Sequence, residues 1–160
     1  MELINIAASI SAPVEIVWPL FSDFGGADRL FPSDGVAPLV PIRMVHVEGD
    51  GIGTIRTIHF SGADPVEERL TRCDHNALIM EYEAPSLPIG VEDYSARIAF
   101  ERETTDNTVI DYTARGVPTF QTAPELRDLL TPLFSALVAG ARQIAEQSPA
   151  TAWKLQKKAA

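Results

Sequence analysis

The sequence is poor in cysteine, with Cys73 as the single thiol among 160 residues. One thiol cannot form a disulfide within the chain, and it cannot build a thiolate metal site. We expect Cys73 to be structural, since free cysteine is usually buried. The three histidines lack the spacing of metal ligands, and no glycine-rich loop leads from a strand into a helix. We therefore expect no metal and no other cofactor.

Positive charge is scarce as well. The chain has 13 lysines and arginines against 22 aspartates and glutamates, which gives a net charge of −9. Such a balance disfavours nucleic acid and anionic membrane surfaces, because both are bound by basic faces. No apolar run is long enough to span a bilayer, and the N-terminus has no basic stretch followed by an apolar run. We therefore expect a cytoplasmic protein that binds neither nucleic acid nor membrane.

The length of the chain is that of one domain with a sizeable core. It contains no internal repeat and no low-complexity linker. We expect a single domain over residues 1–148, followed by a tail over 149–160 whose lysines Lys154, Lys157 and Lys158 are in solvent. The sequence leaves a homodimer open as the oligomeric state.

Hydrophobic periodicity predicts a strand, two short helices and six further strands. The first strand covers 2–10, and the helices cover 13–24, with Ser11 as N-cap, and 27–31. A turn at Ser33–Gly35 separates the second helix from the next strand. The six strands are expected at 39–47, 53–60, 65–74, 77–84, 91–102 and 108–117. Because short turns connect these strands, they should form an antiparallel meander.

A long helix ends the predicted domain. It begins after Thr122, which can form a capping box with Glu125, and it ends at Ser148–Pro149, with a kink expected at Pro132. Its apolar stripe consists of Leu126, Leu130, Leu133, Phe134, Leu137, Val138, Ala141 and Ile144. The simplest arrangement is an α+β fold in which a curved seven-stranded antiparallel sheet wraps around this helix. We expect a cavity where the helix does not fill the concave face.

The predicted strand 65–74 carries a carboxylate on its apolar face. Side chains alternate along a strand, so Glu68 shares a face with Val66 and Leu70. Arg72 has the same parity but lies near the strand end, so we expect it to be in solvent. A carboxylate between core residues is costly unless a partner or a wet cavity receives it. We therefore expect the Glu68 carboxylate to have a partner on a neighbouring strand.

Arg56 is the candidate partner. It lies on the preceding strand and shares a face with Ile58 and Phe60, so Arg56 and Glu68 can be neighbours. The functional interpretation is a polar site in an apolar cavity. The alternative is a buried ion pair with a purely structural role.

Three tyrosines follow the same alternation. Tyr82, Tyr94 and Tyr112 each lie on the mainly apolar face of a strand. A phenol and a guanidinium can both donate to an oxyanion, and a few polar groups among apolar walls are typical of a small-molecule site. Each tyrosine could instead be an ordinary core residue. The expected substrate contacts are Tyr82, Tyr112, Ile58, Phe60, Trp18 and Phe134.

Four stretches of the chain resemble a known superfamily: SAPVEIVWPLFSDF, GDGIGTIR, VEERLTRCD and LPIGVEDYSARIAF. They resemble the START-like (SRPBCC) superfamily with the helix-grip fold, which includes polyketide cyclases, abscisic acid receptors and lachrymatory-factor synthase. The resemblance implies that Arg56, Glu68 and Tyr94 take the places of ligand-contacting or catalytic residues. The loops SGADP and PSLPIG depart from the gate and latch of the receptors, so we do not expect a hormone receptor.

Three functions are consistent with this pattern. The first is a cyclase, dehydratase or lyase for a small hydrophobic carbonyl compound, in which Glu68 moves a proton while Arg56 and Tyr94 hold an oxyanion. The second is a carrier or sensor of a lipophilic molecule, in which Arg56 anchors a carboxylate or carbonyl. The third is a protein-interaction role for the loop at Ser61.

Overall fold

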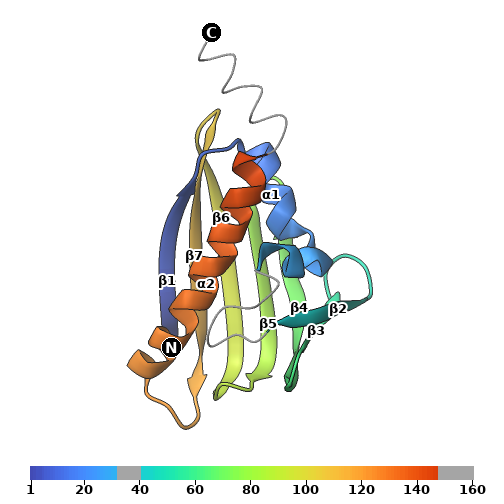
Figure 1. Ribbon diagram of the computed structural model, residues 1–160, viewed down its shortest axis with the longest axis vertical. Coiled ribbons are helices and arrows are strands. Elements are labelled where there is room, and N and C mark those ends of the chain that lie inside the picture. Colours follow the sequence, from blue (N-terminus) through green and yellow to red (C-terminus); the bar gives the residue numbers. More distant parts are fainter. Residues whose placement is uncertain (32–40, 148–160) are drawn as a thin grey trace.

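The computed structural model describes residues 1–31 and 41–147 of the chain (Figure 1). The expected turn at Ser33–Gly35, the start of a strand at residue 39, the helix end at Ser148–Pro149 and the lysines of the tail lie outside the described residues. The elements are β1 (Glu2–Ile10), α1 (Val14–Ser22), the 3-10 helix η1 (Phe24–Leu30), β2 (Ile42–Glu48), β3 (Ile55–Phe60), β4 (Ala63–Asp74), β5 (Ile79–Leu87), β6 (Val91–Thr104), β7 (Asn107–Pro118) and α2 (Ala123–Glu146).

The seven strands form one antiparallel sheet in the order β1-β7-β6-β5-β4-β3-β2. Six consecutive strands therefore pair with their neighbours in sequence, and β1 closes the other edge beside β7. Helix α2 lies across the concave face of the curved sheet, and α1 and η1 pack beside α2 (Figure 1). This arrangement confirms the predicted α+β helix-grip fold.

Helix α2 begins as the sequence predicts. The Glu125 amide donates to Thr122 Oγ1 at 3.3 Å, and the Thr122 amide donates to Glu125 Oε2 at 2.7 Å, which completes a capping box. Helix α2 spans both sides of Pro132 as one element. Most of the predicted stripe is buried, but Ile144 is exposed and Ala145 is buried in its place.

The last turn of α2 explains both this exchange and a wrong cap prediction. Glu146 accepts a hydrogen bond from the Ser11 amide, and Arg142 donates to the Ser9 carbonyl, so this turn lies close to the backbone that follows β1. A small residue such as Ala145 fits there. The prediction of Ser11 as N-cap is wrong, because α1 begins at Val14 and its N-cap is Pro13, which makes no side-chain cap hydrogen bond.

Bulges change which residues face the concave side. Between Leu70 and Arg72, β4 has one more residue than β5, so Arg72 pairs with Glu81 and turns outward. The prediction that Arg72 shares a face with Glu68 is therefore wrong. A similar irregularity in β2 pairs Met44 with His59 on the outer face. Alternation fails at such points because the extra residue shifts the parity.

Several strand ends also differ from the predictions. Strand β4 begins at Ala63, so Ser61 and Gly62 alone make the turn after β3, and Gly62 has a φ of 79°. Strand β5 continues to Leu87, and Leu78 lies in the preceding turn rather than in the strand. The extra length of β4 brings a further residue of its inner face into the site described below.

The core lies between α2 and the sheet. Helix α2 packs mainly against β1, β7 and the short helices. It approaches η1 closely at Gly140, where a Cβ atom would lie 1.8 Å from the Leu30 carbonyl oxygen. Among the helices of residues 1–31 and 41–147, none combines the length and the hydropathy needed to cross a membrane.

Candidate functional site

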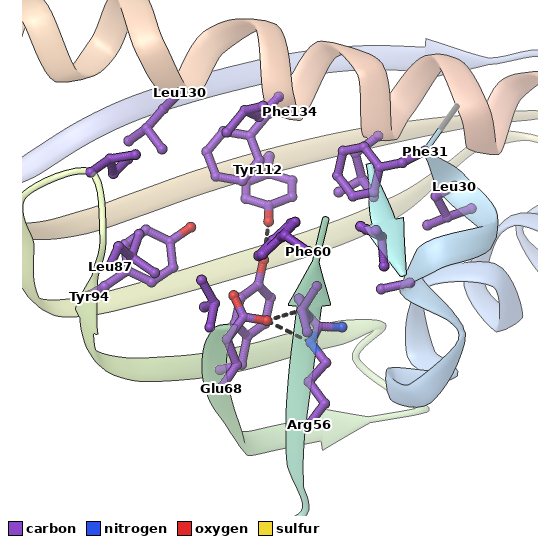
Figure 2. Close-up of a pocket in the computed structure, with 18 of the residues that line it drawn as sticks. Leu30, Phe31, Arg56, Phe60, Glu68, Leu87, Tyr94, Tyr112, Leu130 and Phe134 are labelled. Atoms are coloured by element: carbon purple, nitrogen blue, oxygen red, sulfur yellow. Dashed lines mark hydrogen bonds and ion pairs between the residues drawn. The ribbon is translucent and has the colours of Figure 1, made fainter. Parts of the chain in front are cut away.

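A cavity of about 240 Å³ lies between α2 and the inner faces of β3 to β7. Its walls are mostly apolar, and its polar side chains come from adjacent strands (Figure 2). A dry cavity of about 150 Å³ holds benzene, so this one is large enough for a ligand of about two fused rings. The cavity therefore suits a small, mainly apolar molecule.

Arg56 and Glu68 face each other across the β3–β4 ladder and are both buried. The Arg56 Nε and Nη2 atoms each lie 2.6 Å from the same carboxylate oxygen, Glu68 Oε2. Within the described part of the chain, no hydrogen bond to the other oxygen, Oε1, is formed. In Figure 2 this oxygen points toward the side of the cavity where Tyr94 lies. One oxygen of Glu68 is thus available to a ligand.

The remaining contacts of Arg56 hold its guanidinium in place. Its Nη1 atom donates to the Phe24 carbonyl at 3.0 Å. Its Cζ atom lies 4.0 Å from the ring centroid of Phe24 and 4.8 Å from that of Tyr82, as in cation–π contacts. Burial works against the charge, but the Glu68 carboxylate together with the oxygens of Tyr82 and Tyr112 outweighs it, and the pKa of Arg56 is raised. Arg56 is therefore a fixed cation that is engaged with Glu68.

The three tyrosines form a buried row of hydroxyl groups. The hydroxyls of Tyr82 and Tyr112 are hydrogen-bonded to each other, and Tyr94 lines the same cavity beside them. Burial raises the pKa of Tyr82 to about 12, and it raises the pKa values of Tyr94 and Tyr112 well above the ordinary value. The phenols are neutral at physiological pH, so they act as hydrogen-bond donors rather than as bases.

This row has hydrogens to spare. Three hydroxyl groups carry three hydrogens, and the Tyr82–Tyr112 hydrogen bond uses one of them. The hydrogen of Tyr94 can therefore be donated to a ligand oxygen. The Tyr112 ring is fixed by Phe134, whose centroid lies 3.9 Å away. The row is therefore a rigid donor beside the free oxygen of Glu68.

The bulge in β6 determines where Tyr94 points. Asp93 has a positive φ of 48°, and the register with β7 shifts between Glu92 and Ser95. As a result Val91 and Tyr94, three residues apart, are both buried. Beyond the bulge, regular alternation places Ala96 on the same inner face.

Most of the predicted site residues come together in the cavity. Arg56, Glu68 and Tyr94 line it, and so do the predicted contacts Tyr82, Tyr112, Ile58, Phe60 and Phe134. Trp18 is the exception. Its indole N–H donates to His75 Nδ1 at 2.9 Å, and its ring packs edge-on against Phe100 with a centroid separation of 5.2 Å. The structure therefore gives Trp18 a place in the core beside the cavity, not on its wall.

Two groups that the sequence analysis missed belong to the site. The Phe24 carbonyl holds Arg56, and no sequence pattern signals a backbone acceptor. Asp64 lines the cavity and is exposed. It shares parity with Val66 and Glu68, so a strand prediction that began two residues earlier would have found it.

The model of one protein family, described as polyketide cyclase / dehydrase and lipid transport, matches residues 2–154. Similar solved structures include the protein XoxI from Bacillus cereus, at 17% identity and a TM-score of 0.76 over 90% of this chain and 95% of that one. A comparison with curated proteins gives no match.

Two structures with enzyme names are also similar. The Zhui aromatase/cyclase from a Streptomyces species has 17% identity and a TM-score of 0.71, over 90% of this chain and 93% of that one. Norcoclaurine synthase from Thalictrum flavum, in complex with dopamine and hydroxybenzaldehyde, has 20% identity and a TM-score of 0.65, over 91% and 86%. At these identities the likeness concerns the fold. The family match over nearly the whole chain goes further: the protein belongs to the polyketide cyclase / dehydrase and lipid transport family, within the polyketide-cyclase-like branch of the START-like (SRPBCC) superfamily.

Proposed function

We propose that the protein is a cyclase-, dehydratase- or lyase-type enzyme that acts on a small hydrophobic carbonyl compound by acid/base catalysis. The observation that carries this proposal is the free Oε1 oxygen of buried Glu68, which points toward the side of the cavity where Tyr94 lies. A carboxylate with one engaged and one free oxygen is held in place yet able to accept a proton. The cyclase and dehydrase members named in the family description support the same reaction type.

In the proposed reaction, Glu68 Oε1 takes a proton from the carbon next to the substrate carbonyl. A hydroxyl hydrogen of the tyrosine row that is not used within the row is donated to the carbonyl oxygen, where negative charge develops as the enolate forms. We assign this donor to Tyr94, which lies at the end of the row. In a dehydration, Glu68 then returns its proton to the leaving hydroxyl, and water departs.

The contacts of Arg56 change the role that the sequence suggested for it. Nε and Nη2 donate to Glu68 and Nη1 donates to the Phe24 carbonyl, while aromatic rings cover the guanidinium. We therefore propose that Arg56 positions the Glu68 carboxylate and balances its charge, and that the oxyanion is held by the phenol row.

The test is product analysis with a panel of aromatic β-hydroxy ketones, in which loss of water is read by mass. Glu68→Gln should lower kcat/KM by about 100-fold or more, as expected when a general base is removed. Tyr94→Phe should lower kcat by a similar factor of about 100, because one oxyanion donor is lost.

Glu67→Gln is the matched control, since Glu67 directly precedes Glu68 on β4 and is exposed on the outer face. It should retain the native rate. Circular dichroism of every variant shows that the fold is kept. Full activity in Glu68→Gln would contradict the proposal.

The second candidate is binding or transport without chemistry. The mostly apolar walls of the cavity favour it, and the family description includes lipid transport. Native mass spectrometry against lipophilic alcohols, ketones and acids tests this candidate. A ligand that stabilises the protein and is recovered unchanged supports a carrier, whereas recovery of an altered molecule supports the enzyme.

A further inference from the structure

We propose that the cavity selects ligands by charge: it takes uncharged ligands with a hydroxyl donor, it excludes carboxylates, and Asp64 enforces this selection at the mouth. The inference rests on the proposed function only in using the same cavity. It names the chemical class of ligand that the cavity accepts, and it does not depend on whether that ligand reacts.

The interior offers no free positive charge to an anion. Within residues 1–31 and 41–147, Arg56 is the only lysine or arginine that lines the cavity. Three of its five N–H groups are used, two on Glu68 at 2.6 Å and one on a backbone carbonyl, and the Glu68 carboxylate balances its charge. A ligand carboxylate would therefore meet the free oxygen of Glu68 rather than an available guanidinium, and like charges in a buried site repel strongly.

The free oxygen of Glu68 instead requires a hydrogen-bond donor. A carboxylate oxygen only accepts, so a ligand O–H satisfies it and a ligand carbonyl does not. The Tyr94 hydroxyl has a hydrogen to give, so it can bind an acceptor atom of the same ligand. An ammonium group would also donate to Glu68, but its charge would have to lose its hydration beside the fixed cation of Arg56. The uncharged hydroxyl is therefore the better match.

Asp64 extends this preference to the mouth. The register with β3 shifts between Val66 and Ala63, and both Ala63 and Asp64 line the cavity, where Asp64 is exposed. Four residues of strand place the backbone of Asp64 at most about 13 Å from that of Glu68. No ion pair or hydrogen bond joins its side chain to the described residues. Among the described residues, the charged groups that line the cavity are Arg56, Glu68 and Asp64, which together leave one negative charge in excess.

The whole chain adds to the same field, since its net charge is −9. A negative opening lowers the local concentration of anions and slows their entry, and the effect weakens as salt is added. Charge selection at this site therefore has two parts, a repulsive mouth and an interior whose one cation among the described lining residues, Arg56, is paired with Glu68.

The experiment compares three probes with one carbon skeleton: naphthylmethanol, naphthoate and naphthylmethylammonium. Isothermal titration calorimetry at neutral pH and low salt gives each affinity. Naphthylmethanol should bind at least about tenfold more tightly than naphthoate, since a few ångströms of like-charge approach cost this much or more. Asp64→Asn should strengthen naphthoate binding about fivefold and leave naphthylmethanol within about twofold.

Glu67→Gln again serves as the control, because it removes one negative charge from the outer face of the same strand. It should not change the order of the probes. The inference is overturned if naphthoate binds as tightly as naphthylmethanol, if the ammonium binds most tightly, if no probe binds, or if Asp64→Asn acts no differently from Glu67→Gln. If the expected order is found but no carbonyl compound is turned over, charge selection stands and the proposed enzymatic function fails.

Discussion

The two halves of the concave face follow the same strand alternation but differ in what covers them. On the side of β1 and β7, helix α2 packs directly on the sheet, and Leu3, Ile10 and Leu126 are completely buried. On the side of β3 to β5, the inner faces line a cavity and carry Arg56 and Glu68. Both sets of residues are buried, so burial does not distinguish core from site. The distinction is whether helix α2 packs directly on that half of the sheet.

This difference explains why polar residues persist on inner strand faces. Where α2 covers the sheet, an ionised side chain would displace apolar contacts and lose its hydration. Where α2 leaves a cavity, the same side chain needs only one partner within the sheet, and it keeps an unoccupied direction. Glu68 has such a direction, because its Oε1 oxygen faces the cavity.

Breaking the buried ion pair should give the largest effect on stability. Arg56→Met leaves Glu68 buried without its partner and should cost about 3–5 kcal/mol of unfolding free energy. Urea denaturation measures this loss. The double variant Arg56→Met/Glu68→Leu should recover most of it, because neither charge is then left unpaired.

Arg69→Met is the matched control on the outer face of β4, where Arg69 pairs with Glu83 in an exposed salt bridge. Such pairs contribute at most about 1 kcal/mol. If Arg56→Met cost no more than Arg69→Met, the two faces of β4 would not differ as described.

A pair of isoleucines tests whether the two halves differ in packing. Ile110 is completely buried and does not line the cavity, whereas Ile58 borders it. Ile110→Ala should cost about 2–5 kcal/mol, the usual range for a large-to-small change in a packed core. Ile58→Ala should cost less than half as much, because part of its side chain already faces empty space. Equal losses in urea denaturation would mean that both halves are packed alike.

Alkaline pH should destabilise the cavity half through its tyrosines. The pKa of Tyr82 is raised to about 12 in the folded protein, whereas the unfolded chain titrates near 10. The stability that this difference represents is fully present below pH 10 and is lost as pH rises toward 12, because only the unfolded chain releases its proton. Tyr82 alone accounts for roughly 3 kcal/mol of this loss.

Urea denaturation at a series of pH values from about 9 to 12 measures the slope. The chain has only three tyrosines, and all of them belong to the buried row. Tyr82→Phe should flatten the slope, and a Cys73→Ser background removes the one thiol that also titrates in alkali. A slope that Tyr82→Phe leaves unchanged would remove the tyrosines as its source.

The sequence predicts the fold and most of the candidate site because both depend on alternation. Short turns specify the meander, and parity places Arg56, Glu68 and Tyr112 on one side of the sheet. Trp18 shows the limit of this reasoning. Its helical stripe predicts that it is buried, but only the tertiary packing decides that it contacts His75 and Phe100 rather than a ligand.

Bulges set the second limit. An extra residue in β4 turns Arg72 outward, and the left-handed backbone of Asp93 accompanies the bulge before Tyr94. Such irregularities leave little trace in a hydrophobic pattern, because they depend on how two strands pair. The Phe24 carbonyl is invisible for a related reason: every residue has one, and only the folded chain brings this one to Arg56.

Gly140 has a consequence for anyone who wishes to redesign the protein. The missing side chain at this position lets the backbone of η1 rest on α2, and Leu30 of η1 is part of the cavity wall. A methyl group added at Gly140 would force η1 away from α2 and move the cavity wall at Leu30 outward. The size of the cavity can thus be changed by a substitution at the contact between α2 and η1, without altering any group that contacts the ligand.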